Sequence, residues 1–169
     1  EFKRQIPRPK PYAPYTVLHT LSELTKGEAN IVTDVGQNQM WTAQYYDFER
    51  PHSLITSGGL GAMGFGMGAA IGAALGKPER KTVLITGDGG FHMSLSELAT
   101  LSRYNIPVVV IVMNNGVLGM VRQWQTTFYE KRYSDTDPHR KTDFVKLAEG
   151  FGAKGYRAAT PAEFKAAFA

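Results

Sequence analysis

The 169-residue sequence predicts an α/β domain with a doubly wound, mostly parallel sheet and helices on both faces. Two short β-rich runs, Thr82–Thr86 and Val108–Met113, flank a helical segment at Leu95–Tyr104. A strand–helix–strand unit of this length joins parallel strands by a right-handed crossover. Gly87-Asp88-Gly89 follows the first strand and Asn114-Asn115 follows the second. Both motifs are therefore predicted at one carboxyl edge of the sheet, where open α/β sheets bind ligands.

The chain before this unit is predicted to contribute a linker, a helix and a third strand. Residues 1–14 are predicted to be an interdomain linker, because their four prolines disfavour both helix and sheet. The domain itself is predicted to occupy residues 15–169. It begins with a helix at Thr16–Leu24 and continues with a strand at Ile31–Val35. The exit of that strand at Gly36-Gln37-Asn38 adds a third loop to the ligand edge.

The uncharged stretch Ser57–Gly76 is predicted to be a buried helix that packs closely on the sheet. It is nearly as long as a membrane span, but eight of its twenty residues are glycine, so its hydrophobicity is too modest for one. Within it, Gly59–Gly64 matches the GxGxxG fingerprint of dinucleotide-binding sites. The lead-in Arg50–Thr56 is polar and the nearest downstream acid is Glu79, which makes a nicotinamide site the weaker alternative.

The last third of the chain is predicted to add two helices and part of a strand. Lys141–Gly150 is predicted to be helical, and Tyr156–Ala158 is expected near a fourth strand. Thr160 and Glu163 form a capping-box pattern at the start of a helix over Pro161–Ala169. Because no strand follows, the domain is expected to be truncated before its last strand and the chain to be a fragment.

The residue types at the predicted edge suit a metal and a phosphate. Asp88 offers a carboxylate and Asn115 an amide oxygen, hard ligands that suit Mg²⁺ or Ca²⁺ rather than zinc. Mg²⁺ usually takes further ligands from water, a main-chain carbonyl and substrate phosphate. Gly87, Gly89 and Gly90 leave main-chain amides open to an anion. Each motif alone is typical of an ordinary turn, but the two together favour a diphosphate held through a metal.

A Gly-Asp-Gly followed some two dozen residues later by Asn-Asn resembles the cofactor motif of thiamine diphosphate enzymes. That resemblance implies that Mg²⁺ is held by the side chains of Asp88 and Asn115 and by the main-chain carbonyl of Val117. Gly89 and Gly90 would contact the diphosphate. Position 117 needs only its backbone for this role.

Three further stretches, Asp34–Trp41, Ser57–Gly66 and Leu118–Trp124, narrow the family. They are similar to the diphosphate-binding domain of the catalytic (large) subunit of acetolactate (acetohydroxyacid) synthases, and the similarity runs from about Tyr12 to the end. The cofactor-binding residues that this resemblance implies are Val35, Gly36, Gln37, Asn38, Gly61, Met63, Gly87, Asp88, Gly89, Gly90, Asn115, Val117, Leu118, Gly119 and Met120.

The same resemblance implies individual roles around the cofactor. Gln37 and the residue at 38 would reach the diphosphate. The Gly61 carbonyl would accept a hydrogen bond from the aminopyrimidine, and Met63 would be the wedge that bends the cofactor. Position 38 departs from the pattern, since Asn38 stands where many members have histidine. Asparagine still offers a hydrogen bond but has no titrating group.

Met120 and Trp124 are implied to line the substrate pocket. From spacing alone, Met120, Trp124 and Phe128 would equally suit an apolar helix face packed in a core. His92 is a second departure from the family pattern. It follows the Gly87–Gly90 segment that is predicted to bind phosphate, at a position that is usually apolar. The four histidines show no paired metal-ligand spacing and are interpreted as structural or exposed.

The resemblance implies an enzyme that transfers two-carbon units. The intact protein would use thiamine diphosphate and Mg²⁺ to decarboxylate pyruvate and condense the hydroxyethyl intermediate with a second 2-keto acid, in branched-chain amino acid biosynthesis. The glutamate that activates the cofactor lies on the family's pyrimidine-binding domain, which no segment here resembles. No catalytic residue is therefore expected in this fragment, and the isolated fragment is expected to be inactive.

Partners follow from the same resemblance. They are the missing pyrimidine and central domains, a second copy in a homodimer or tetramer, and a regulatory small subunit. FAD, where an intact enzyme binds it, would lie on the central domain and not on this one. Two alternatives stay open: a related pyruvate oxidase or 2-keto acid decarboxylase, and a noncatalytic phosphate-binding or assembly module.

The amino-acid composition argues against several kinds of site and partner. The absence of cysteine excludes disulfides and thiolate metal sites and is compatible with a reducing cytoplasm, the expected location. The net charge of +4 arises partly from basic residues near the start and around residues 131–141. Glu130, Asp135 and Asp137 interrupt the second group, so no nucleic-acid partner is expected. No membrane partner is expected either.

Overall fold

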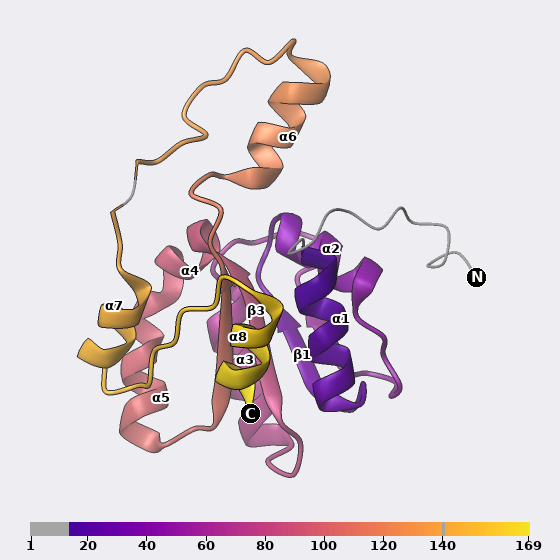
Figure 1. Ribbon diagram of the computed structural model, residues 1–169, viewed down its shortest axis with the longest axis vertical. Coiled ribbons are helices and arrows are strands. Elements are labelled where there is room, and N and C mark those ends of the chain that lie inside the picture. Colours follow the sequence, from indigo (N-terminus) through magenta and orange to yellow (C-terminus); the bar gives the residue numbers. More distant parts are fainter. Residues whose placement is uncertain (1–13, 140) are drawn as a thin grey trace.

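A computed structural model describes residues 14–139 and 141–169. A four-stranded sheet lies between two layers of helices (Figure 1). The strand order is β2-β1-β3-β4, and every neighbouring pair is parallel. The strands are β1 Asn30–Thr33, β2 Leu54–Thr56, β3 Thr82–Gly87 and β4 Val108–Met113. The predicted doubly wound α/β class is confirmed.

Eight α-helices are assigned in these residues, with a 3₁₀ turn, Leu95–Glu97, before α5. They are α1 Pro14–Thr25, α2 Gln37–Tyr45, α3 Phe65–Gly76, α4 Asp88–Ser94, α5 Leu98–Tyr104, α6 Gly119–Phe128, α7 Phe144–Gly150 and α8 Pro161–Phe168. None of the helices in the described residues has both the length and the apolar character needed to cross a bilayer.

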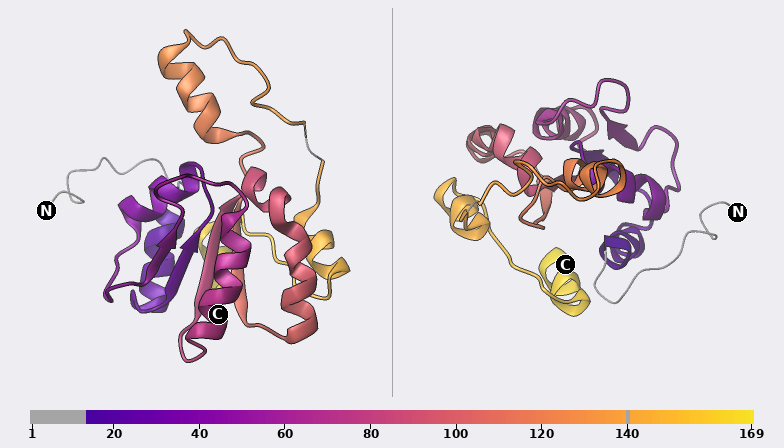
Figure 2. Two further views of the ribbon diagram at one scale, coloured as in Figure 1. Left: turned by 180° about the vertical axis from the view of Figure 1, so that it is seen from behind. Right: turned by 90° about the horizontal axis from the view of Figure 1, so that it is seen from above.

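Alternation along the strands sends successive side chains to opposite faces of the sheet. On β3, Val83 and Ile85 pack with α1 and α8, whereas Leu84 packs with α3, α4 and α5. The two faces are also distinct in Figure 2, where α1 and α8 lie on one side of the sheet and α3 and α5 on the other. Burial on both faces explains why the central strands are nearly continuous apolar runs.

Register brings the two predicted motifs together. Gly87, the last residue of β3, pairs with Met113, the last residue of β4. The segments that follow therefore leave the sheet side by side at one carboxyl edge. Beyond this edge, α6 stands away from the body of the domain (Figure 1).

The start of the domain differs in detail from the prediction. Residues 1–13 of the predicted linker lie outside the described residues. Pro14 is the first residue of α1 rather than part of a linker, since proline is tolerated in the first turn of a helix. β1 ends at Thr33, and Gln37 and Asn38 are not in a loop but in the first turn of α2. The predicted helix at Ser57–Gly76 begins only at Phe65, after a glycine-rich turn.

The fourth strand was predicted in the wrong place. It is β2, a three-residue edge strand that pairs with β1, and Tyr156–Ala158 is not in the sheet. The helix predicted from Lys141 begins at Phe144, because Asp143 caps it by accepting hydrogen bonds from the main-chain N–H groups of Val145 and Lys146. The predicted capping box of Thr160 and Glu163 is confirmed at α8.

Helix α3 packs on β3 so closely that one of its glycines has no room for a side chain. A Cβ at Gly66 would lie 2.7 Å from Leu84 Cδ1, whereas a Cβ at Gly72 would meet nothing within 4 Å. We expect Gly66→Ala to lower the free energy of unfolding by about 1–3 kcal/mol through overpacking. Gly72→Ala should raise it by about 0.5–1 kcal/mol, since alanine loses less backbone entropy in a helix. Urea titration of the two variants tests this, and equal stabilities would contradict the close approach.

Candidate functional site

A pocket of about 190 Å³ lies at the carboxyl edge, between the ends of β1, β3 and β4. Every residue predicted above to bind the cofactor lines it. These residues come from four separate segments of the chain, so the fold brings together what the sequence spreads over 86 positions. Three further residues that were not predicted also line the pocket, namely Trp41, Met113 and Val121. Helical spacing from Gln37 would have indicated Trp41.

Asp88 is the first residue of α4, directly after β3, and only 3% of its surface is exposed. In the described residues, no hydrogen bond or ion pair to its carboxylate is found, although it borders the pocket. No side-chain oxygen that is fully buried in the described residues lacks a hydrogen-bond partner, so the Asp88 carboxylate must open to the pocket. A cation in the pocket would be able to bind it.

Asn115 and Val117 form a tight turn that also lines this pocket. The Val117 N–H donates to Asn115 Oδ1 at 3.0 Å, and Gly116 between them has a positive φ of 70°. A Cβ on Gly119 would touch Gln37 Oε1 and lie 2.9 Å from Asn115 Nδ2. Glycine at 119 therefore allows the Gln37 and Asn115 side chains to approach the start of α6.

The donor set fits a hard divalent cation. It offers one carboxylate from Asp88, one amide oxygen from Asn115 and the main-chain carbonyl of Val117. In the described part of the chain, no cluster of three or more histidine, cysteine, aspartate or glutamate residues could hold a metal. Three oxygen ligands leave positions that Mg²⁺ would fill with water and phosphate oxygens. The residues present therefore fit a metal–diphosphate group better than a metal bound by protein alone.

The β3–α4 turn is open to an anion. The N-cap residue of α4 is Gly87, which has no side chain to cap the helix. Gly89 and Gly90 lie in the first turn. The first N–H groups of a helix have no partner within the helix. They are available to phosphate oxygens in the pocket that these glycines line.

Asn38 is less available than its family position suggests. Its Nδ2 donates to the main-chain carbonyls of Asp34 at 3.0 Å and Ile85 at 3.1 Å. Because both partners are acceptors, the network fixes the orientation of the amide. The remaining Oδ1 is an acceptor and repels an anion. Direct contact of Asn38 with a diphosphate is not supported by this geometry.

His92 has a structural role at this turn. Its Nδ1 lies 2.6 Å from the Asp88 carbonyl oxygen and its Nε2 2.7 Å from Thr142 Oγ1. A carbonyl only accepts, so Nδ1 donates to Asp88, and Nε2 forms the second hydrogen bond, with the Thr142 hydroxyl. The ring also packs against Phe144 at 5.3 Å between centroids. His92 thus joins the start of α4 to the segment before α7.

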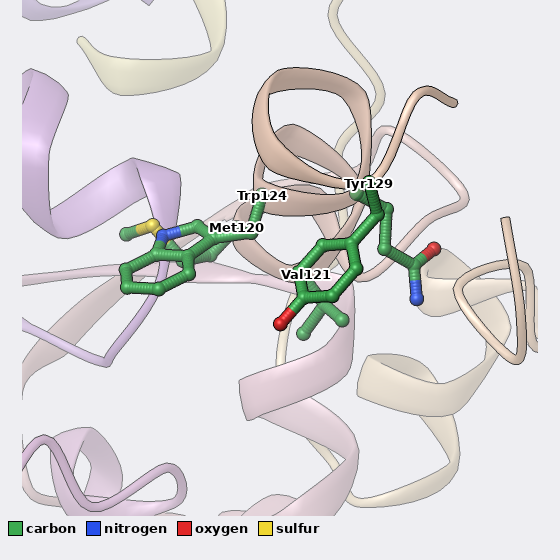
Figure 3. A pocket seen from close by; sticks show the side chains of 5 residues that line it. Met120, Val121, Trp124 and Tyr129 are labelled. Atoms are coloured by element: carbon green, nitrogen blue, oxygen red, sulfur yellow. The ribbon is translucent and has the colours of Figure 1, made fainter. Parts of the chain in front are cut away.

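A second, larger cavity of about 460 Å³ lies along α6 and is lined by Met120, Val121, Trp124, Gln125 and Tyr129 (Figure 3). Met120 borders both cavities. Trp124 is 56% exposed and Phe128 67% exposed, and their rings meet edge to face at 5.4 Å. The alternative of an apolar helix face packed in the core is therefore wrong for α6 in this structure.

Comparison with known proteins agrees with this geometry. The domain family described as "Thiamine pyrophosphate enzyme, C-terminal TPP binding domain" matches residues 34–169. The chain is 52% identical over 137 residues to a probable acetolactate synthase large subunit of Methanococcus aeolicus, covering 81% of this chain and 23% of the relative. It is 47% identical over 152 residues to the acetolactate synthase large subunit of Haemophilus influenzae, covering 90% and 26%.

A solved structure shares the fold. The thiamine diphosphate-dependent 4-hydroxybenzoylformate decarboxylase of Rhodococcus jostii superposes with a TM-score of 0.86 at 28% identity, over 96% of this chain and 31% of that one. The chain spans about a quarter of the length of the curated relatives it matches. It belongs to the thiamine pyrophosphate enzyme family, as the C-terminal cofactor-binding domain, and within that family it is similar in sequence to acetolactate synthase large subunits.

Proposed function

We propose that this domain holds the diphosphate of thiamine diphosphate through Mg²⁺, within an acetolactate synthase. The observation that supports it most is the carboxylate of Asp88, which has no protein partner among the described residues and opens to a pocket lined by every predicted cofactor residue. Asp88, Asn115 and the Val117 carbonyl would hold the metal. The N–H groups of Gly89 and Gly90 would bind the diphosphate, and Gln37 would approach it from α2.

The glycine-rich turn before α3 would orient the other end of the cofactor. Gly61 is exposed and lines the pocket, which fits the proposed hydrogen bond from the aminopyrimidine to its carbonyl, and Met63 is partly exposed at the same pocket. When bound, thiamine diphosphate would supply the carbon centre that attacks a 2-keto acid. The chain's own contribution is to hold the diphosphate and orient the rings.

In the intact protein we propose that this chemistry serves acetolactate formation from pyruvate. Identities of 47–52% to acetolactate synthase large subunits favour it over a 2-keto acid decarboxylase, for which the solved relative has 28% identity. Supplying pyruvate to the intact protein separates the two: acetolactate supports a synthase, and release of acetaldehyde supports a decarboxylase. Cofactor binding without either product would support a noncatalytic assembly module.

The rest of the site is proposed to lie outside this chain. A pocket of about 190 Å³ is small beside the ~300–1,000 Å³ that enclose drug-sized ligands, so another domain would have to cover the remainder. The length of the relatives, about four times the matched part, is compatible with pyrimidine and central domains. Homodimer or tetramer formation, a regulatory subunit, FAD on the central domain and a cytoplasmic location belong to the same proposal.

Metal binding tests the proposal directly. We expect thiamine diphosphate to raise the affinity of the chain for Mn²⁺, a spectroscopic substitute for Mg²⁺, by roughly 5–150-fold, since coupled ligands change each other's affinity by equal factors. Electron paramagnetic resonance of free Mn²⁺ measures it. Thiamine, which lacks the diphosphate, is the control and should leave Mn²⁺ affinity unchanged. Equal Mn²⁺ affinities with and without thiamine diphosphate would contradict the proposed half-site.

A further inference from the structure

Asp34, at the exit of β1, is a buried carboxylate that has no part in the site described so far. Only 1% of its surface is exposed. Its Oδ1 accepts from the N–H of Val35 at 2.8 Å and of Gly64 at 3.0 Å, and its Oδ2 accepts from the N–H of Gly66 at 2.9 Å. Three main-chain donors from two segments thus converge on one side chain.

This carboxylate takes the place of a helix cap. Helix α3 has Gly64 at its N-cap, with no side-chain cap of its own. Asp34, 30 residues earlier, accepts from that N-cap residue and from Gly66 in the first turn. A carboxylate at a helix start satisfies free N–H groups and is favoured by the helix dipole. The charge is therefore compensated without a cation.

The β3–α4 turn (Gly87–Gly90) also packs closely against the Asp34 side chain. A Cβ on Gly90 would lie 2.8 Å from Asp34 Cγ and 3.2 Å from Thr86 Oγ1, so only glycine fits there. Asn38 Nδ2 donates to the Asp34 main-chain carbonyl. Asp34 thus connects the β1 exit with the start of α3 and with the β3–α4 turn. The β1 exit, the β3–α4 turn and the turn directly before α3 all contribute residues to the pocket.

The turn before α3 has few other restraints. Cβ atoms built on Gly58 and Gly61 would each have a single neighbour, no closer than 3.8 Å, and one on Gly59 would have none within 4 Å. Two of its other hydrogen bonds are local, from the Ala62 N–H to Ser57 Oγ at 3.1 Å and from the Phe65 N–H to the Ala62 carbonyl at 3.3 Å. At its first residue, Gln39 Nε2 of α2 donates to the Ser57 carbonyl at 3.2 Å, where the turn leaves β2. At its other end, next to α3, Asp34 connects the turn to the exit of β1.

We infer that Asp34 is a positioning residue, which fixes the Gly61–Met63 turn relative to the β3–α4 turn. Asp34 thereby sets the distance between the part of the site that would hold the rings of the cofactor and the part that would hold its diphosphate. This rests on the proposed function, because that turn is where the rings would lie. An asparagine at 34 keeps the shape but has one acceptor oxygen, and its NH₂ group would face a main-chain N–H. Asp34→Asn should free the turn while the metal and diphosphate ligands stay in place.

The experiment compares Asp34→Asn with Asp143→Asn. Asp143 is a matched control, since its carboxylate also accepts two main-chain N–H groups at a helix start but does not line the pocket. In Asp34→Asn we expect amide exchange of Gly64 and Gly66 to accelerate roughly tenfold or more, and the Met63 methyl NMR signal to shift. Thiamine diphosphate affinity should fall roughly 10–100-fold, while the affinity for Mn²⁺ with inorganic diphosphate changes little. Asp143→Asn should leave all four quantities unchanged.

Each result is decisive. Equal losses of affinity for thiamine diphosphate and for inorganic diphosphate would show general damage and overturn the inference, as would unchanged exchange at Gly64 and Gly66. If the variant does not fold, exchange in the unmodified chain decides, because Gly64 and Gly66 must exchange far more slowly than Gly59. If the unmodified chain binds neither ligand, the proposed function fails as tested, and the exchange and methyl signals still decide whether Asp34 anchors the turn.

Discussion

Asp88→Ala is expected to weaken Mg²⁺-dependent binding of thiamine diphosphate by more than about 100-fold. Loss of a residue that only supports a metal ligand costs 10–100-fold, so loss of the single carboxylate ligand should cost more. Asp88 is the one acidic side chain at the pocket among the described residues. Calorimetric titration of thiamine diphosphate in the presence of Mg²⁺ measures the effect.

The same variant should not destabilise the ligand-free fold. Its carboxylate opens to the pocket and makes no hydrogen bond or ion pair in the described structure, so its removal breaks no contact, and we expect the free energy of unfolding to change by no more than about 0.5 kcal/mol. Asn114→Ala is the control, because Asn114 is exposed and does not line the pocket. Normal binding by Asp88→Ala, or an equal loss in Asn114→Ala, would contradict the assignment of the metal ligand.

The sequence predicted β3 and β4 well because both faces of these strands pack against helices. β4 is a continuous apolar run although it is a half-buried edge strand, β3 is nearly one, and a polar motif follows each of them. β2 has only three half-buried residues and one neighbour, so its pattern is too short to detect. At the other end, the chain near Tyr156 packs on a helix: a Cβ on Gly155 would lie 2.8 Å from the Val145 carbonyl oxygen of α7.

The residue types of the candidate site were predictable, whereas their long-range contacts were not. Gly-Asp-Gly and Asn-Asn are local patterns, and the register of β3 with β4 places them together. The role of Asp34 depends on N–H groups 30 and 32 residues away, and the engagement of Asn38 on a carbonyl 47 residues away. No local spacing indicates such bonds, because the tertiary fold creates them.

Phe91→Ala is expected to lower the free energy of unfolding by about 3–5 kcal/mol, the usual cost of removing a buried phenylalanine. Phe91 is 5% exposed, packs in the core on the α3 and α5 side of the sheet, and meets Phe144 of α7 at 5.7 Å between ring centroids. It follows Gly89 and Gly90 directly. A seven-residue helix is marginal by itself, so packing of this ring must hold α4 in place.

Phe128→Ala provides the matched control, because Phe128 is 67% exposed on α6 and its loss should change stability by no more than about 0.5 kcal/mol. Phe91→Leu should lie between the two, since leucine keeps most of the buried volume. Urea titration of all three variants gives the comparison. Because a domain is stable by only about 5–15 kcal/mol, the Phe91→Ala loss would also raise local opening of the β3–α4 turn. If Phe91→Ala and Phe128→Ala were equally stable, the core would not hold α4, and the alignment of Asp88, Gly89 and Gly90 would have to depend on the ligand itself.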